Sequence, residues 1–170
     1  MRIPLDHICV KSGILCPRCQ RLVDAGIVSH LDVDLMRALL ELEELSGFRV
    51  LRNAEYKKSV KANEFVVVII DSGGLITKPQ LIRLSRALSE KIGLKVRVID
   101  STSSDVKSLV LQVIAPARLF GVNTLWLPDG TTQYIVRISR HDIRHLPTRR
   151  EVLESILTQM LGMQVRIKAE

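Results

Sequence analysis

Aromatic side chains are scarce in this chain. Phe, Trp and Tyr make up 4% of its 170 residues, although 46% of the residues are hydrophobic. A folded core must therefore be built from Val, Ile and Leu, and a surface of stacked aromatic rings, which some RNA-binding modules use, is not expected. The 25% of charged residues indicates a globular chain and not a disordered one. The length allows one compact domain or two small ones of about 70 residues each.

Long apolar runs are also missing. The longest, Phe65–Ile70, is far shorter than the ~20 residues of a membrane span. The opening residues 1–7 contain Pro, Asp and His where a secretory signal needs an apolar stretch. All three cysteines lie within the first twenty residues and cannot form a disulfide framework. We therefore expect no membrane partner and a reducing, cytoplasmic location.

The motifs of common enzyme classes do not occur. The sequence has no GXSXG elbow, no phosphate-binding P-loop, no dinucleotide fingerprint and no HEXXH. Asp71 and Asp129 stand in turn sequences, where aspartate is common for structural reasons. We predict that the chain is not an enzyme and has no small-molecule substrate. A zinc-dependent enzyme would need an open coordination position and a nearby general base.

The cysteines are spaced as metal ligands. Cys16 and Cys19 form a CXXC pair, the spacing of a zinc knuckle, and Cys9 precedes the pair by seven residues. Tetrahedral zinc needs a fourth ligand, which His7 could supply through nitrogen or Asp6 through oxygen. The alternatives are three reduced cysteines or a redox CXXC, but the latter is typical of a βαβ context that this segment lacks. We predict one bound Zn²⁺.

Hydrophobic periodicity divides the chain into three parts. We predict a small Cys-bearing, zinc-knuckle-like head over residues 1–30, followed by two units, 31–100 and 101–170, that share one order of elements. The first unit is expected to contain a helix over 31–47, strands at 48–51 and 65–70 joined by a basic stretch, a turn at 71–74, a helix over 79–92 and a strand at 95–99. The second is expected to contain a helix that is capped by Ser104-Asp105 and runs towards Ala115, and a hairpin of strands 122–127 and 134–138 with its turn at 128–131. A helix over 148–161 and a strand at 164–168 are expected to follow.

The two units read as copies of one another. When the sequence is shifted by 69 positions, residues 65–100 fall on 134–169 without a gap. Gly93 then meets Gly162, and Arg97 meets Arg166, in addition to several aliphatic matches. Any two strand-helix-strand segments of equal length would match at apolar positions, but the paired Gly and Arg favour a true duplication.

The sequence pattern of the first copy resembles that of a KH domain. The strand and turn at 65–76, the helix at 81–88 and the strand that follows at 92–98 are close to the pattern of the prokaryotic type. Two such units behind a Cys-bearing head resemble the archaeal NusA-like tandem KH proteins, a family of transcription elongation factors. The resemblance implies an α+β fold with two type II (αββααβ) KH-like domains. It also implies a role in archaeal transcription elongation or termination as a protein that binds single-stranded RNA.

One feature of KH domains is missing from both copies. A KH domain holds about four nucleotides with a GXXG loop, where the absence of side chains lets the backbone approach the phosphates. The corresponding positions are 77–80, Thr-Lys-Pro-Gln, and 146–149, Leu-Pro-Thr-Arg. Neither has a glycine, and proline removes a backbone donor. RNA binding would therefore depend on charge.

The net charge of +7 favours a polyanionic partner. Arginine is suited to bidentate phosphate contacts and to stacking on bases. The candidate RNA-binding residues are Lys57, Lys58, Lys61, Lys78, Arg83, Arg86, Arg140, Arg144, Arg149 and Arg150. The alternative function is a protein-protein adaptor on RNA polymerase or the ribosome, in which the KH-like units have lost RNA binding. We expect Trp126, the only tryptophan, in the core, and His141 and His145 on the surface.

Overall fold

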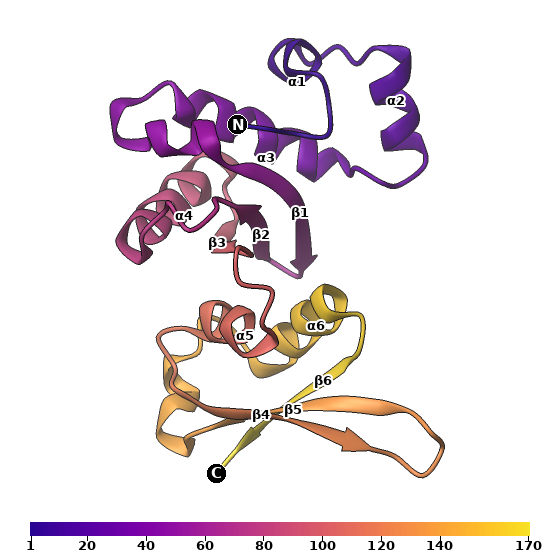
Figure 1. Cartoon of the computed structure of the whole chain (residues 1–170), viewed down its shortest axis with the longest axis vertical. Coiled ribbons are helices and arrows are strands. Elements are labelled where there is room, and N and C mark those ends of the chain that lie inside the picture. Colours follow the sequence, from indigo (N-terminus) through magenta and orange to yellow (C-terminus); the bar gives the residue numbers. More distant parts are fainter. The chain divides into compact units, whose positions relative to one another are not determined.

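The structure, a computed structural model, describes all 170 residues and has a mixed α+β fold with two three-stranded sheets (Figure 1). It divides into two compact units. The first comprises Met1–Ser59 and Val68–Thr102, and the second comprises Ser103–Glu170 and Val60–Val67. No helix is both long and apolar enough to cross a bilayer.

The Cys-bearing head contains two short helices that hydrophobic periodicity did not predict. Helix α1 (His7–Ser12) ends at Gly13, whose positive φ of 78° suits glycine. Helix α2 (Pro17–Asp24) begins with Pro17 at its first position, and the Cys16 sulfur accepts a hydrogen bond from the backbone N–H of Cys19. Both helices are too short for a clear apolar stripe, so only this local chemistry marks their ends.

The rest of the first unit follows the order helix, strand, strand, helix, strand. Helix α3 (His30–Glu43) begins with a capping box between Ser29 and Asp32, and α4 (Lys78–Ile92) ends at Gly93. The remaining elements are η1 (Ser46–Asn53), β1 (Glu55–Ala62), β2 (Phe65–Asp71) and β3 (Lys95–Asp100), and the strand order is β1-β2-β3. The end of β1 and the start of β2, within Val60–Val67, are the part of this sheet that groups with the second unit.

Two predictions for this unit are wrong. Residues 48–51, predicted as a strand, form short 3₁₀ turns within η1, and the first strand is the basic stretch that was interpreted as a loop. The predicted helix over 31–47 also ends early, at Glu43, so Gly47 does not terminate it. The reason is that a run of four residues shows no decisive period, whereas Tyr56 and Val60 of β1 are buried in spite of the lysines between and beside them.

The second unit places two helices on one face of its sheet (Figure 1). Helix α5 (Val106–Ile114) is capped by Asp105, as predicted, and α6 (Arg150–Leu161) ends at Gly162. The other elements are β4 (Leu119–Trp126), β5 (Thr132–Ile138), η2 (Arg140–His145) and β6 (Gln164–Ala169). The strand order is β4-β5-β6, with β4 antiparallel and β6 parallel to β5.

The two units repeat at the level of single hydrogen bonds. The shift of 69 positions carries the whole of β3 onto β6. At one equivalent pair, Ser89 Oγ accepts from the backbone N–H of Val96 at 2.9 Å, and Thr158 Oγ1 accepts from that of Val165 at 3.1 Å. At a second pair, the distances are both 2.9 Å, from Val98 N to Ser85 Oγ and from Ile167 N to Glu154 Oε1. In each unit, side chains of the last helix therefore bind the backbone of the last strand.

Trp126 was predicted in the core, and this prediction is wrong: its side chain is 75% exposed. It lies opposite Thr132 at the end of the β4–β5 hairpin, just before the predicted turn at Pro128 and Gly130. The hairpin extends past α5 and α6 (Figure 1), so no helix covers the ring.

Candidate metal centre and basic surfaces

Four ligand-type side chains meet in the head. The ligand atoms of Asp6, Cys9, Cys16 and Cys19 all lie within 4.8 Å of one another and could hold a metal ion. Cys9 and Cys19 are buried, Cys16 is half-buried, and Asp6 is exposed. Helix α1 carries Cys9, and the start of α2 carries the CXXC pair, so the two short helices bring the three sulfurs together.

Backbone amides point at all three sulfurs. The N–H of Cys16 donates to Cys9 Sγ at 3.3 Å, that of Cys19 to Cys16 Sγ at 3.5 Å, and that of Asp6 to Cys19 Sγ at 3.4 Å. Hydrogen bonds to a sulfur favour its anionic form, which is the form that binds metals. The backbone is therefore arranged to stabilise three thiolates in one place.

Without a cation, however, the ionisation of Cys19 is opposed. Burial and the neighbouring thiols of Cys9 and Cys16 raise the pKa of Cys19 to about 11, although the Asp6 amide acts against them. The pKa of Cys16 is lowered, chiefly by the backbone hydrogen bond from Cys19. A bound divalent cation removes this conflict, because it stabilises coordinating thiolates directly.

The structure distinguishes the two candidates for the fourth ligand. Asp6 belongs to the cluster, where its carboxylate accepts from the Cys16 thiol at 3.5 Å and from Arg18 Nη1 at 3.4 Å. The His7 ring instead places Nε2 at 2.8 Å from the carbonyl oxygen of Met1. His7 is not part of the cluster in this conformation.

The second unit concentrates arginines around η2 and the start of α6. Arg140, Arg144, Arg149 and Arg150 are all exposed and none forms an ion pair, although Arg144 lies 3.4 Å from the His145 ring. Elsewhere in this unit two arginines, Arg118 and Arg137, are neutralised by carboxylates. Arg137 pairs with Glu170 at 2.9 Å.

A buried carboxylate holds this arginine-rich segment in place. Asp142 of η2 is 6% exposed and accepts from both the backbone N–H and the Nε of Arg118, each at 3.1 Å. Burial opposes its ionisation, but the hydrogen bonds and charge of Arg118 outweigh burial and lower its pKa. The segment is thereby fixed to the residue just before β4. Sequence reasoning did not find this contact, because the two residues lie far apart in the chain.

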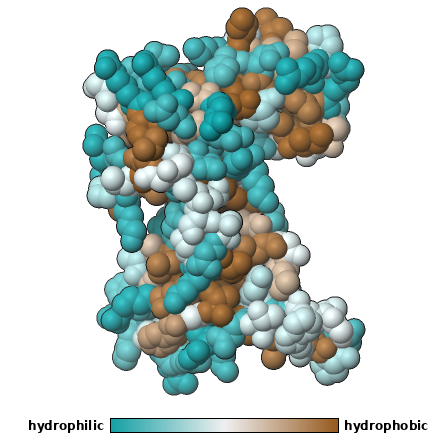
Figure 2. All heavy atoms as spheres, viewed as in Figure 1, coloured by the Kyte–Doolittle hydropathy of each residue, from teal (hydrophilic) through white to brown (hydrophobic).

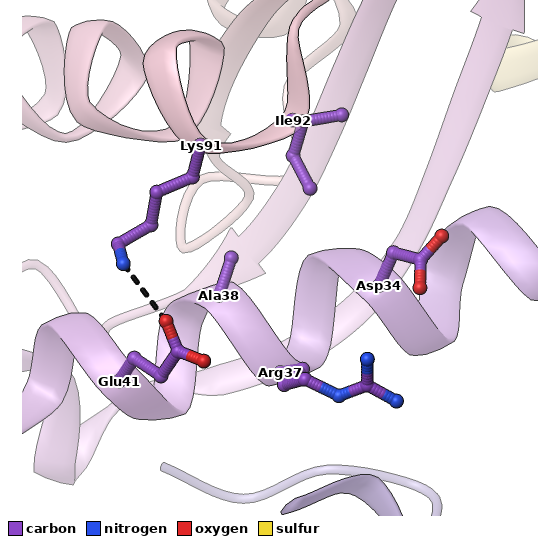
Figure 3. Close-up of a pocket in the computed structure, with 6 residues that line it drawn as sticks. All are labelled: Asp34, Arg37, Ala38, Glu41, Lys91 and Ile92. Atoms are coloured by element: carbon purple, nitrogen blue, oxygen red, sulfur yellow. Dashed lines mark hydrogen bonds and ion pairs between the residues drawn. The ribbon is translucent and has the colours of Figure 1, made fainter. Parts of the chain in front are cut away.

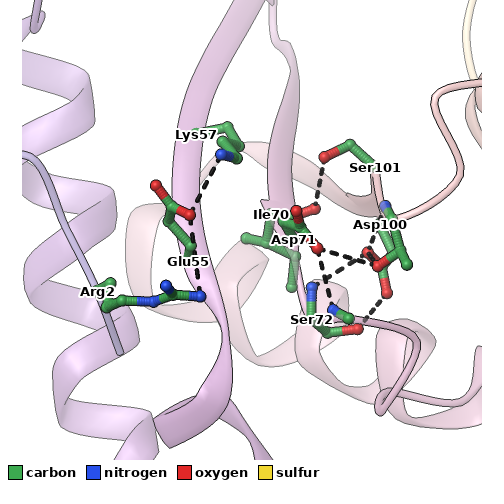
Figure 4. Close-up of polar contacts among 10 residues, drawn as sticks. Arg2, Glu55, Lys57, Ile70, Asp71, Ser72, Asp100 and Ser101 are labelled. Atoms are coloured by element: carbon green, nitrogen blue, oxygen red, sulfur yellow. Dashed lines mark hydrogen bonds and ion pairs between the residues drawn. The ribbon is translucent and has the colours of Figure 1, made fainter.

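The cations of the first unit are more dispersed. Lys57 on β1 pairs with Glu55 at 3.2 Å, whereas Lys58 and Lys61 are exposed without an ion pair (Figure 4). Arg83 on α4 lies over the ring of Phe48, with its guanidinium carbon 5.9 Å from the ring centre. The other two candidates, Lys78 and Arg86, are exposed on α4.

The two segments that were expected at the position of a GXXG loop, 77–80 and 146–149, stand at the start of a helix. Thr77 caps α4 through a reciprocal contact with Gln80, and Pro79 lies in the first turn. In the second unit, Arg149 occupies the cap position of α6 and makes no side-chain cap bond. In both units, the residues that differ from a GXXG loop thus lie where a loop meets the start of a helix.

The hollow between α3 and α4 gives no sign of a small-molecule site. It has a volume of about 330 Å³ and lies between α3 and α4 (Figure 3). Its charged side chains already have partners: Lys91 pairs with Glu41 at 2.8 Å, and Arg37 Nε donates to the Val10 carbonyl at 2.9 Å. Only Asp34 remains to bind a ligand there.

The head exposes apolar side chains that the sequence did not single out. Ile8, Ile14 and Ile27 are 81%, 79% and 70% exposed, and apolar residues are visible over α1 and α2 in Figure 2. Single exposed apolar side chains are common on protein surfaces, whereas a contiguous apolar patch marks a protein contact. Ile8 lies next to Cys9, so this apolar surface adjoins the metal cluster.

Comparison with known proteins identifies the fold but no family. No protein-family model and no curated protein matches the chain. Solved structures do match, among them the crystal structure of APE1850, which aligns with a TM-score of 0.52 and 17% identity over 78% of this chain and 96% of that one. At this level of identity the likeness shows a shared fold alone.

Proposed function

We propose that this chain is a non-enzymatic RNA-binding protein that contacts phosphates through the arginines around η2 and α6. The observation that carries the proposal is the set of four exposed, unpaired arginines, Arg140, Arg144, Arg149 and Arg150, within eleven residues. Unneutralised charge of one sign costs stability through self-repulsion unless a counter-charge binds. A single-stranded RNA backbone supplies that charge at the spacing of successive phosphates.

The order of elements supports a KH-like interpretation of the second unit. The sequence α5, β4, β5, η2, α6, β6 follows the αββααβ order of the type II domain, with η2 as the short helix before α6. The first unit has no helix between β2 and α4, so it follows this order less closely. We therefore assign the main RNA contact to the second unit, and a NusA-like role in transcription remains part of the same proposal.

Salt dependence of binding tests this function. We expect a single-stranded RNA of mixed sequence to bind with a log Kd that rises linearly with log salt. Replacing Arg144, Arg149 and Arg150 by Ala should weaken binding to all sequences alike. It should also lower the slope by about 2, since each phosphate contact on a single strand contributes about 0.7. Fluorescence anisotropy at several salt concentrations measures both quantities.

A matched control removes the same charge elsewhere. Lys11, Arg52 and Lys107 are exposed cations without ion pairs on three other elements, and their triple Ala variant should keep most of the slope. Equal losses in the two variants would show that net charge alone attracts RNA. No binding of the unaltered protein at low salt would refute the proposal and favour the protein-protein adaptor, for which the exposed isoleucines of the head are suited.

We further propose that the ion held by the cysteine cluster is Zn²⁺. Zinc binds both thiolate sulfur and carboxylate oxygen, and it prefers four ligands in a tetrahedron. Three thiolates and one carboxylate make up such a set. All four positions are filled by protein, which is typical of a structural site and not a catalytic one. When bound, the ion would supply thiolate stabilisation and a rigid link between α1 and α2.

Metal analysis of protein purified without chelator tests the zinc assignment. We expect close to one zinc per chain in the unaltered protein and its loss in a Cys16→Ser variant. Ser12→Ala is the matched control, because this hydroxyl lies on α1 near Cys9 without belonging to the cluster. Stoichiometric zinc in the Cys16→Ser protein, or iron in place of zinc in the unaltered one, would contradict the assignment.

A further inference from the structure

The edge strands of the two sheets differ in how far they are covered and in the charge that they carry. Each three-stranded sheet has two edge strands, so the chain has four: β1, β3, β4 and β6. The outward N–H and C=O groups of an edge strand can pair with any other strand, and proteins avoid this by covering the edge or charging it.

The edge of β1 is covered and charged. Arg2 forms a parallel bridge beside it: the Arg2 N–H donates to the Ala54 carbonyl at 2.9 Å, and the Tyr56 N–H donates to the Arg2 carbonyl at 2.8 Å. The Arg2 guanidinium also lies 3.9 Å from the Glu55 carboxylate (Figure 4). Three lysines along β1 add the charge that discourages pairing.

At the edges of β3 and β6, helix side chains occupy the backbone N–H groups. Side chains of α4 and α6 accept the backbone N–H groups of these strands, at Val96 and Val98 and at Val165 and Ile167. Cations follow both strands as well, and on β6 they are Arg166 and Lys168. Three of the four edges thus carry both a covering contact and positive charge.

The edge of β4 carries neither. Its only strand partner is β5, no side chain binds its outward backbone, and Leu119–Trp126 contains no charged residue. Phe120, Leu125 and Trp126 are 54%, 43% and 75% exposed. One bulge between Leu119 and Gly121 interrupts the strand at its start and leaves the remainder regular. In Figure 2 the end of the hairpin is mostly pale, the colour of residues of intermediate hydropathy.

We propose that β4 pairs antiparallel with β4 of a second copy of this chain. A chain of net charge +7 repels a second copy over most of its surface, so contact requires a region without charge. A different protein that recognised this basic chain by charge would find no ionic partner on β4. A strand that fits must itself be uncharged and apolar, and β4 meets that requirement.

Antiparallel pairing makes the contact self-complementary. A two-fold axis sets the end of one β4 beside the beginning of the other, so each strand donates and accepts the same hydrogen bonds. The exposed Trp126 of each copy then loses part of its contact with water. The two sheets become one continuous sheet in which neither β4 is an edge.

Self-association can be followed with the only tryptophan of the chain. As the full-length protein is concentrated, sedimentation velocity should show a monomer becoming a dimer. The Trp126 emission should shift to shorter wavelength over the same range, because dimerisation buries the ring. Leu125→Lys adds to β4 the charge that the other edges carry, and this variant should stay monomeric with unshifted emission.

Gln159→Lys is the matched control. Gln159 is exposed on α6, so the substitution adds the same charge to the same unit and should leave dimerisation unchanged. Circular dichroism of both variants establishes that they fold. A monomer at all concentrations would overturn the proposal, and so would a dimer that Leu125→Lys does not disrupt. The result is independent of RNA, because neither substitution touches the arginines around η2.

Discussion

At the scale of single residues, the fourth member of the cluster in the head is set by which of two neighbouring side chains, Asp6 or His7, points toward the cysteines. Asp6 and His7 are neighbours and both can bind zinc, so the sequence left them as alternatives. In the structure His7 starts α1 and its ring contacts the Met1 carbonyl, whereas the Asp6 carboxylate lies with the sulfurs. Which of the two side chains lies with the sulfurs is therefore decided by where α1 begins, a boundary that periodicity does not give.

This difference predicts the behaviour of two alanine variants. Asp6→Ala should lower zinc affinity by more than the roughly 10- to 100-fold that loss of an outer-shell partner costs, since a direct ligand is removed. His7→Ala should leave the affinity unchanged. Competition with a chromophoric chelator measures both. The reverse order of effects would show that His7 is the ligand in solution.

At the scale of elements, the sequence predicted best where apolar periodicity was long or a cap was marked. The helix expected over 79–92 is α4, the strand expected at 95–99 is β3, and Asp105 caps α5. The short α1, α2 and η1 were missed, because six to eight residues give no reliable period. Trp126 was misplaced because periodicity reports which residues share a face, but not where the covering helices stop.

The equivalent hydroxyls of the two units offer a test at this scale. Ser89→Ala and Thr158→Ala each leave a strand N–H, at Val96 and Val165, without its partner. We expect each substitution to lower the free energy of unfolding by about 1 kcal/mol. Urea denaturation measures the change, with Ser155→Ala on the exposed surface of α6 as the control. If the three variants were equally stable, these contacts would not hold the edges of the sheets.

At the scale of the whole molecule, the parts differ in what stabilises them. The two sheet-bearing units bury many aliphatic side chains, whereas the head buries few beyond Leu5, Val10 and the two cysteines Cys9 and Cys19. So small an apolar core does not stabilise two short helices by itself. If the cysteine cluster holds the proposed ion, we therefore expect the head to depend on it and the remainder of the chain not to.

Metal removal should accordingly affect only one part of the molecule. When a metal chelator is added, we expect proteases to cleave within residues 1–29, while a fragment that begins near α3 persists. Mass spectrometry of the products over time identifies the cleavage sites. Added zinc should restore resistance. Cleavage spread evenly over the chain would mean that the ion stabilises more than the head.

The buried contact of Asp142 with Arg118 has a consequence for how RNA would bind. Flexible basic loops lose conformational entropy when they settle on a polyanion, and this loss reduces the affinity that their charges provide. The segment that carries Arg140 and Arg144 is already fixed by Asp142 before any partner arrives. Only the arginine side chains then remain to be ordered, so the affinity gained per charge should exceed that of an equally basic but mobile tail.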